Sequence, residues 1–129
     1  MRHHIDVLGL LHVVWGVFAL LAGASLAILA LGTHAALAVG GPTGVAPKAA
    51  VWLMAVTSIL MCLFGAGAVR AGRGLRRLDR SARQLAIVLA VPNLLVIPFG
   101  TALAIYSFWV LLNNDAREAF GRPARGTSV

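Results

Sequence analysis

Cysteine and acidic residues are scarce in this sequence, and each shortage excludes a class of protein. Cys62 is its only cysteine, so an intrachain disulfide is excluded. Eleven lysines and arginines stand against four acidic residues, which all lie outside the long apolar stretches: Asp6, Asp79, Asp115 and Glu118. Those stretches therefore lack the paired carboxylates of general acid–base chemistry.

Catalytic and cofactor-binding patterns are missing as well. The chain has no Ser, His and Asp arrangement for nucleophilic catalysis, and its cysteine and histidines lack the spacing of a metal site. Gly72-Arg73-Gly74 is too short for a phosphate-binding loop. We predict that the protein is not an enzyme and has no catalytic residue, metal or cofactor.

Apolar residues, in contrast, are abundant. They form 60% of the 129 residues, whereas a soluble domain has about 45–50%. The stretches 7–31, 49–69 and 85–112 contain no Asp, Glu, Lys or Arg. A helix needs about 20 apolar residues to cross the roughly 30 Å hydrocarbon core of a bilayer. The pattern predicts an all-α fold and a single transmembrane domain over 1–129.

Glycine, proline and arginine divide this domain into four predicted helices. Because Pro98-Phe99-Gly100-Thr101 is typical of a tight turn, the last apolar stretch is expected to form a short hairpin rather than one long kinked helix. Its second helix is only about 21 Å long, so it requires local thinning of the bilayer. We expect helix 1 over about 7–31, an outer loop over 32–47, helix 2 over about 48–70, a cytoplasmic arginine loop over 71–80, helix 3 over about 81–97, helix 4 over about 100–113 and a cytoplasmic tail over 114–129.

The basic residues predict how the chain crosses the membrane, because arginine and lysine collect in cytoplasmic loops. With four crossings and both termini inside, ten of the eleven face the cytoplasm and only Lys48 lies outside. With three crossings, three arginines change sides. We therefore predict a multi-pass four-helix bundle, N-in and C-in. A re-entrant hairpin over 81–113 gives the same count and stays open.

Six arginines between helices 2 and 3 are expected to contact anionic lipid headgroups, each contributing about 1 kcal/mol near such a surface. The formal charge of +7 does not indicate nucleic acid, because the basic residues lie at the ends of apolar spans. The six are Arg70, Arg73, Arg76, Arg77, Arg80 and Arg83.

Small residues recur at helical spacing and predict close helix packing, which drives association in lipid. Such seams either pack the helices of one chain together or face a second subunit, so a homo-oligomer or a larger membrane complex is expected. The seams contain Gly9, Gly16 and Gly23 on helix 1, and Gly100, Ala104 and Ser107 on helix 4.

His12 and Asn93 are the polar residues in the spans with a possible functional role, since ionisable groups at membrane depth are often functional. His12 either hydrogen-bonds across helices, serves a proton relay or pore, or binds haem together with its copy in a dimer. Asn93 either satisfies a backbone carbonyl freed by the neighbouring Pro92 or contacts a substrate.

The segment Pro98-Phe99-Gly100-Thr101-Ala102-Leu103-Ala104-Ile105-Tyr106, followed by Trp109-Val110-Leu111-Leu112, resembles the C-terminal hairpin of small bacterial four-span integral membrane proteins of uncharacterised function. The resemblance covers roughly residues 81–120. It implies a bacterial inner membrane and carries no activity, cofactor or site residue.

Three functions are compatible with these patterns. The first is a non-enzymatic accessory or scaffold subunit that acts by helix–helix association. The second is an oligomeric channel or transporter for a small solute, with a pore between protomers. The third is a dimeric b-type membrane cytochrome that uses His12.

Overall fold

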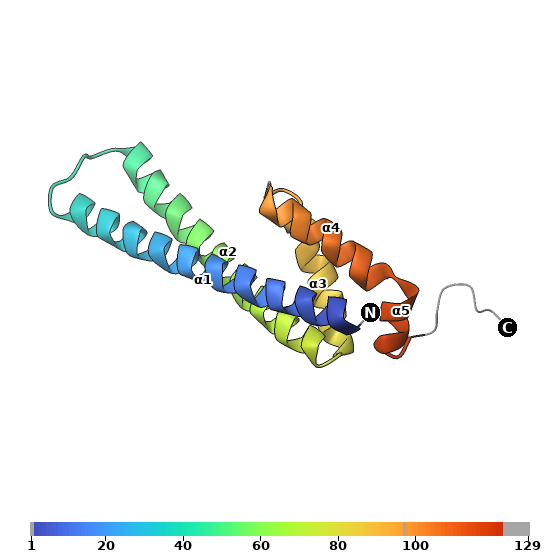
Figure 1. The fold of residues 1–129 in the computed structure, drawn as a ribbon. Coiled ribbons are helices and arrows are strands. Elements are labelled where there is room, and N and C mark those ends of the chain that lie inside the picture. Colours follow the sequence, from blue (N-terminus) through green and yellow to red (C-terminus); the bar gives the residue numbers. More distant parts are fainter. Residues whose placement is uncertain (1, 97, 123–129) are drawn as a thin grey trace. The chain divides into compact units, whose positions relative to one another are not determined.

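The computed structural model describes residues 2–96 and 98–122, and all regular elements within them are helices. This confirms the predicted all-α class (Figure 1). The chain forms two compact units: unit 1 consists of Met1–Gly16 and Gly67–Val129, and unit 2 of Val17–Ala66. The helices are α1 (Arg2–Ala38), α2 (Val45–Arg76), α3 (Arg80–Asn93), α4 (Phe99–Leu112) and α5 (Asn114–Ala119).

The helices α1 and α2 are long and apolar enough to cross a membrane, with mean hydropathies of 2.3 and 2.1 over their most apolar windows. Both extend beyond the predicted bounds. The prediction ended them where the apolar residues end, but a helix continues through arginine, histidine and alanine, which are compatible with helical backbone. As a result the predicted outer loop shortens to 39–44. The helix α1 ends at Ala38, and Gly40, two residues later, has a φ of +121°, which lies outside the helical region.

The predicted arginine loop is mostly helical. The helix α2 continues to Arg76, so only residues 77–79 separate it from α3. Leu78 in this turn has a φ of +57°, a left-handed conformation that is uncommon for leucine. Asp79 caps α3 by accepting a hydrogen bond from Ser81 N at 3.1 Å. The helix therefore begins just before Ser81, close to the predicted start.

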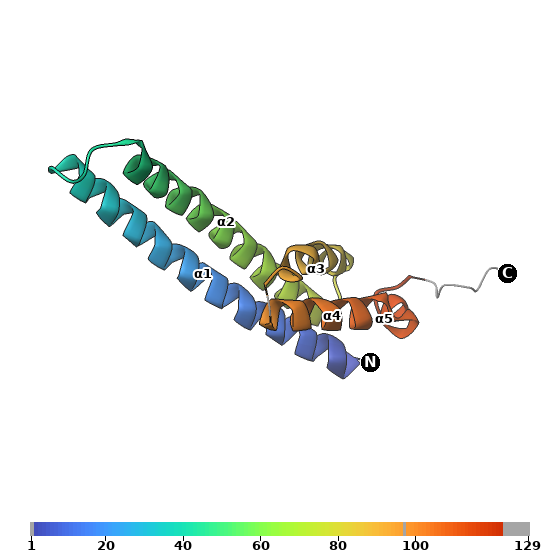
Figure 2. The same ribbon diagram turned by 90° about the horizontal axis from the view of Figure 1, so that it is seen from above.

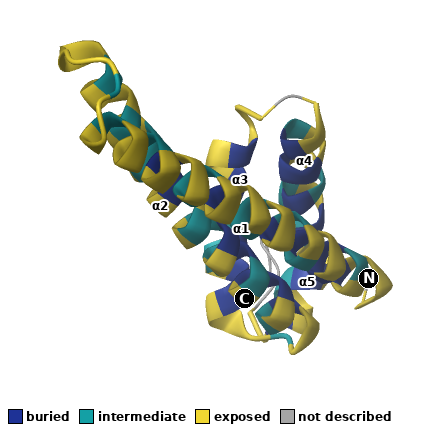
Figure 3. Cartoon of the chain, turned by 90° about the vertical axis from the view of Figure 1, so that its left-hand side faces the viewer, coloured by how far each residue is buried: buried dark blue, intermediate teal, exposed yellow. Residues whose placement is uncertain are grey.

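In unit 1, α3 and α4 pack against each other as an antiparallel pair. The start of α3 meets the end of α4, because the Arg83 guanidinium bonds the Leu111 carbonyl. The end of α3 meets the start of α4, where the Asn93 carbonyl lies 2.6 Å from the place a Cβ on Gly100 would take. The core of unit 1 contains residues of all five helices and of the segment after α5 (Figure 3): Ile5, Leu8, Ala71, Leu75, Ala86, Leu103, Val110, Leu111, Ala116 and Phe120.

In unit 2, α1 and α2 run side by side and are joined by residues 39–44 (Figure 2). A Cβ on Gly23 would lie 2.8 Å from Cys62 Sγ, and Ser58 Oγ donates to the Gly23 carbonyl at 2.8 Å. Small residues thus let the two backbones approach, and the large apolar side chains lie outside this contact. The exposed apolar side chains on α1 and α2 in this unit include Phe18, Leu21, Ile28, Leu31, Trp52, Leu53 and Leu63.

Gly72 in unit 1 gives the first test of this packing. A Cβ there would clash with the Gly9 carbonyl and lie 2.9 Å from Val13 N. We expect Gly72→Ala to lower the free energy of unfolding by about 1–3 kcal/mol through overpacking. Thermal unfolding in detergent measures the change.

Gly32 on α1 is the matched control, because a Cβ there meets no atom within 4 Å. Gly32→Ala should raise the free energy of unfolding by about 0.5–1 kcal/mol, since alanine loses less backbone entropy in a helix. Equal effects of the two substitutions would contradict the close approach of α1 and α2.

Candidate functional site: the polar core of unit 1

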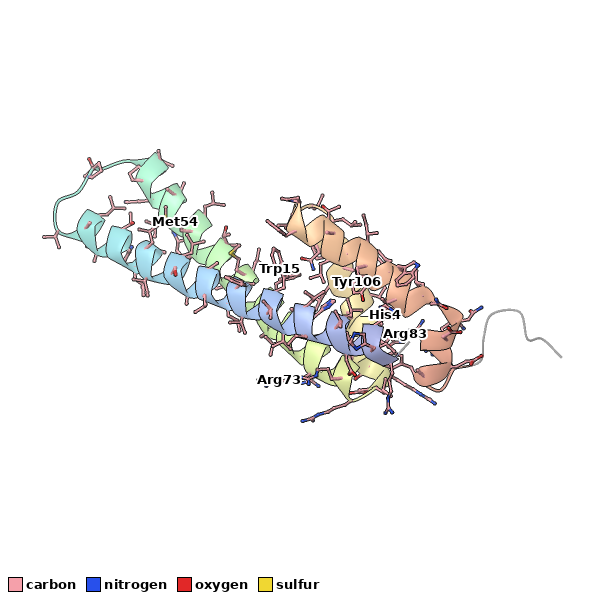
Figure 4. The ribbon with its side chains drawn as sticks, viewed as in Figure 1. His4, Trp15, Met54, Arg73, Arg83 and Tyr106 are labelled. Atoms are coloured by element: carbon pink, nitrogen blue, oxygen red, sulfur yellow. The ribbon has the colours of Figure 1, made fainter. Side chains whose placement is uncertain are left out.

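Unit 1 buries several polar side chains that come from three different helices. Of the described residues in this unit, His12 on α1, Arg83 and Asn93 on α3, and Ser107 on α4 are buried polar or charged side chains. Figure 4 shows His4, Trp15, Arg83 and Tyr106 in the region between α1, α3 and α4. We refer to His12, Trp15, Arg83, Asn93 and Ser107 together as the polar core, although Arg83 and Asn93 lie near opposite ends of α3 and only Trp15 and Asn93 bond each other.

Trp15 and Asn93 join α1 to the end of α3. The indole Nε1 of Trp15 donates to Asn93 Oδ1 at 3.0 Å, and Asn93 is only 2% exposed. A buried indole N–H needs an acceptor, and Asn93 supplies it. The asparagine thus serves a side chain of another helix through its amide oxygen.

His12 is fully buried, and its two ring nitrogens differ in their surroundings. Nδ1 lies 3.0 Å from the Leu8 carbonyl, one turn earlier on α1. Because a carbonyl oxygen only accepts, Nδ1 carries the hydrogen of this bond. In the neutral ring, Nε2 is then a hydrogen-bond acceptor. In the described part of the chain, two buried side-chain N or O atoms have no hydrogen-bond partner, and Nε2 is one of them. His12 is therefore the one member of the polar core with an unmatched atom.

Arg83 ties α3 to the end of α4. Its Nε and one terminal nitrogen donate to the Leu111 carbonyl at 3.0 and 2.7 Å, and the residue is only 6% exposed. Carbonyls in the last turn of a helix have no partner within the helix, and a cation there also stabilises the helix dipole. Arg83 thus has a structural role inside the unit, which the charge pattern alone did not indicate.

The other arginines of the predicted headgroup cluster are exposed. Arg80 donates to the carbonyls of Phe120 and Gly121, both at 3.0 Å, and so holds the segment after α5 against α3. Arg73, Arg76 and Arg77 line an open cleft of about 620 Å³ together with His3, Asp6, Val7 and Leu10. Arg70, one turn before Arg73, is also exposed. Cationic side chains in an open cleft suit an anionic headgroup.

The residues of the predicted small-residue seams all lie in buried positions. Gly9, Gly16 and Gly23 are buried on α1, and Gly9 faces the Gly72 carbonyl and Arg76. On α4, Gly100, Ala104 and Ser107 are buried, and Ser107 Oγ donates to the Leu103 carbonyl at 2.7 Å. The contacts of Gly9, Gly23 and Gly100 are made within one chain.

An aromatic group at the edge of unit 1 was not singled out as a site by the sequence reasoning. His4 Nδ1 lies 3.2 Å from the Tyr106 hydroxyl, and the His4 ring meets Trp109 edge-on at 5.8 Å between ring centroids. Tyr106 and Trp109 stack at 6.2 Å. His4 and Tyr106 are 102 positions apart, so the sequence alone gave no signal that would bring them together.

The polar core joins the helices of unit 1 through hydrogen bonds, Trp15 with Asn93 and Arg83 with the Leu111 carbonyl. Among residues 2–96 and 98–122, no three His, Cys, Asp or Glu side chains gather as a metal ion would require. Comparisons with protein-family models, with curated proteins and with solved structures find no match for this chain.

Asn93 and His12 give a paired test of the polar core. We expect Asn93→Leu to lower the free energy of unfolding by about 1–3 kcal/mol, because it leaves the Trp15 N–H buried without an acceptor. His12→Leu should raise it by about 1 kcal/mol, since the substitution removes an unmatched buried atom. Thermal unfolding in detergent measures whether each substitution raises or lowers the stability of the protein. A strong loss of stability in His12→Leu would show that Nε2 has a partner.

Substitutions of Arg83 and Arg77 give a second paired test of stability. Arg83→Leu removes both bonds to the Leu111 carbonyl and should lower the free energy of unfolding by about 1.5–3 kcal/mol. Arg77→Leu, at an exposed position, should change it by less than about 0.5 kcal/mol. Similar losses of stability in the two variants would refute the capping role of Arg83.

Proposed function

We propose that the chain is an integral membrane protein that acts by helix–helix association, as a non-enzymatic accessory or scaffold subunit of a bacterial inner-membrane complex. The observation that carries this proposal is the sorting of side chains in unit 2. Small residues lie where α1 and α2 meet, and large apolar side chains are exposed on both helices. Such a surface favours aggregation in water, whereas in lipid it is the ordinary surface of a spanning helix.

The charges on α2 support the orientation. Lys48 is in its first turns and Arg70 near its other end, and residues 49–69 between them carry no charge. At 1.5 Å per residue this stretch is about 32 Å long, which fits a hydrocarbon core of roughly 30 Å. Because arginine collects on the cytoplasmic side, the Arg70 end is cytoplasmic. The N-in and C-in arrangement of four helices agrees with this orientation.

A groove in unit 2 is the surface that we assign to a partner. It has a volume of about 690 Å³, is lined mainly by apolar residues of α1 and α2, and includes Ala27, Ala30, Ala55 and Ser58. Small side chains allow the backbone of another helix to approach closely, which is what stabilises helix pairs in lipid. We assign the groove to a transmembrane helix of another subunit. The seams at Gly9 and Gly23 are already used within the chain, so they are not available for this contact.

The mass of the purified particle in mild detergent tests the association. We expect the wild-type chain to migrate as a complex that contains more than one polypeptide. Ala55→Trp fills the groove and should release the single chain. Leu53→Trp, two positions away on α2 and exposed but outside the groove, should leave the complex intact.

Two results would overturn the proposal. A wild-type particle with one polypeptide, its groove occupied only by lipid, contradicts association. A complex that survives Ala55→Trp contradicts the groove as its contact surface. Circular dichroism of each variant distinguishes loss of partner from loss of fold, because only the latter lowers the helix content.

A further inference from the structure

The hairpin of α3 and α4 is too short for the membrane in which the proposed function places it. Each helix has 14 residues, which corresponds to about 21 Å, against a hydrocarbon core of roughly 30 Å. The helix α1, with 37 residues, is about 55 Å long by the same rise. Full crossing by α3 and α4 thus requires either a thinned bilayer or a different placement.

Among the described residues of this hairpin, the polar side chains classed as exposed lie at its base. At the start of α3 lie Arg80, Ser81 and Gln84, all exposed, and at the end of α4 the chain continues into Asn113 and Asn114. Every exposed described residue from 88 to 99 is apolar, with Leu95 85% and Phe99 74% exposed. A tip in the outer headgroup region would instead be expected to carry Trp, Tyr, Lys or Arg.

Several backbone groups of the described residues at the tip find hydrogen-bond partners within the hairpin itself. Non-helical backbone at membrane depth is tolerated only where its polar groups find partners within the protein. Between the two helices, the N–H groups of Leu94, Leu95 and Val96 donate to the carbonyls of Ala90, Pro92 and Asn93. Carbonyls at the tip are also used: those of Val96 and Pro98 accept from the N–H groups of Thr101 and Ala102, and that of Leu94 accepts from Thr101 Oγ1 at 2.9 Å.

The outer loop between α1 and α2 has the opposite character. Residues 39–44 contain three glycines, Pro42 and Thr43, and Lys48 and Trp52 follow within α2. These are the residues of a water-facing turn beside a membrane interface. The loop between α1 and α2 therefore has the composition of a segment that faces water, whereas the tip between α3 and α4 has the composition of a segment that faces lipid.

The tip is also attached to α1 partway along its length. Asn93, the last residue of α3, accepts from Trp15, which lies 13 positions after Arg2 and thus about 20 Å along the helix. The bond thus attaches the tip to the part of α1 that belongs to the same unit.

We infer that residues 80–112 form a re-entrant hairpin that enters from the arginine-rich side and ends inside the bilayer, with Leu94, Leu95, Val96 and Phe99 in contact with lipid acyl chains. This inference rests on the proposed membrane location. The chain then crosses the bilayer twice, through α1 and α2, and the ends of α3 and α4 that carry polar residues lie on one side.

Cysteine labelling in sealed, right-side-out membrane vesicles tests the inference. In a Cys62→Ser background, which removes the native thiol, single cysteines are placed by Leu95→Cys at the tip, Thr43→Cys in the outer loop and Glu118→Cys on α5. A membrane-impermeant maleimide is added first outside, then after the vesicles are opened, and last in detergent.

We expect Thr43→Cys to react from outside, Glu118→Cys only in opened vesicles, and Leu95→Cys only in detergent. Reaction of Leu95→Cys from outside, together with Thr43→Cys, would overturn the re-entrant hairpin and support full crossing. Its reaction in opened vesicles before detergent would place the tip in water and overturn it as well. If Thr43→Cys and Glu118→Cys react from the same side, the membrane topology of the proposed function fails instead.

A charge at the tip gives an independent readout. Leu95→Lys should reduce the amount of protein recovered in the membrane fraction, because lysine is disfavoured inside hydrocarbon. Thr43→Lys is the matched control in the outer loop and should leave recovery unchanged. Normal recovery of Leu95→Lys would contradict a tip surrounded by acyl chains.

Discussion

The close approach of the α1 and α2 backbones is the constraint on which the rest of the structure depends. In unit 1, Gly72 stands so close to the Gly9 carbonyl that a side chain does not fit between them. In unit 2, Gly23 meets Ser58 and Cys62 in the same way. With small residues at these contacts, the bulky apolar side chains are left on the outer surfaces. Both the proposed membrane location and the proposed partner groove follow from this sorting.

The helical class and the approximate positions of the helices could be predicted, because apolar runs of this length with so few charges leave little choice. The hairpin of α3 and α4 was expected from Pro98 and Gly100. The ends of the long helices were predicted wrongly, because composition shows where the apolar residues end but not where helical hydrogen bonding ends. Arg76 illustrates this: it was assigned to a loop by its charge, and it lies on α2.

The polar core was harder to predict, because its members pair across long sequence separations. His12 and Asn93 were recognised as polar residues at depth, but nothing in a single sequence links Asn93 to Trp15, 78 positions away. Arg83 was grouped with five other arginines by its position, although it is buried and caps α4. The charge pattern of a sequence groups arginines that lie in the same segment, whereas the burial of each arginine depends on which helices pack against each other. This is why one arginine of six has an interior role.

Quenching of tryptophan fluorescence by brominated acyl chains tests the central claim, that large apolar side chains face lipid while small and polar ones pack within the protein. Trp52 is 73% exposed, and Trp15 is half-buried and bonded to Asn93. Because Trp52 also lines the groove that we assign to a partner helix, the chain is reconstituted without other subunits and at a low ratio of protein to lipid. In liposomes with brominated lipid, a variant that retains only Trp52 should then be quenched strongly, and one that retains only Trp15 much less. Equal quenching of the two, or no quenching of Trp52, would contradict the account.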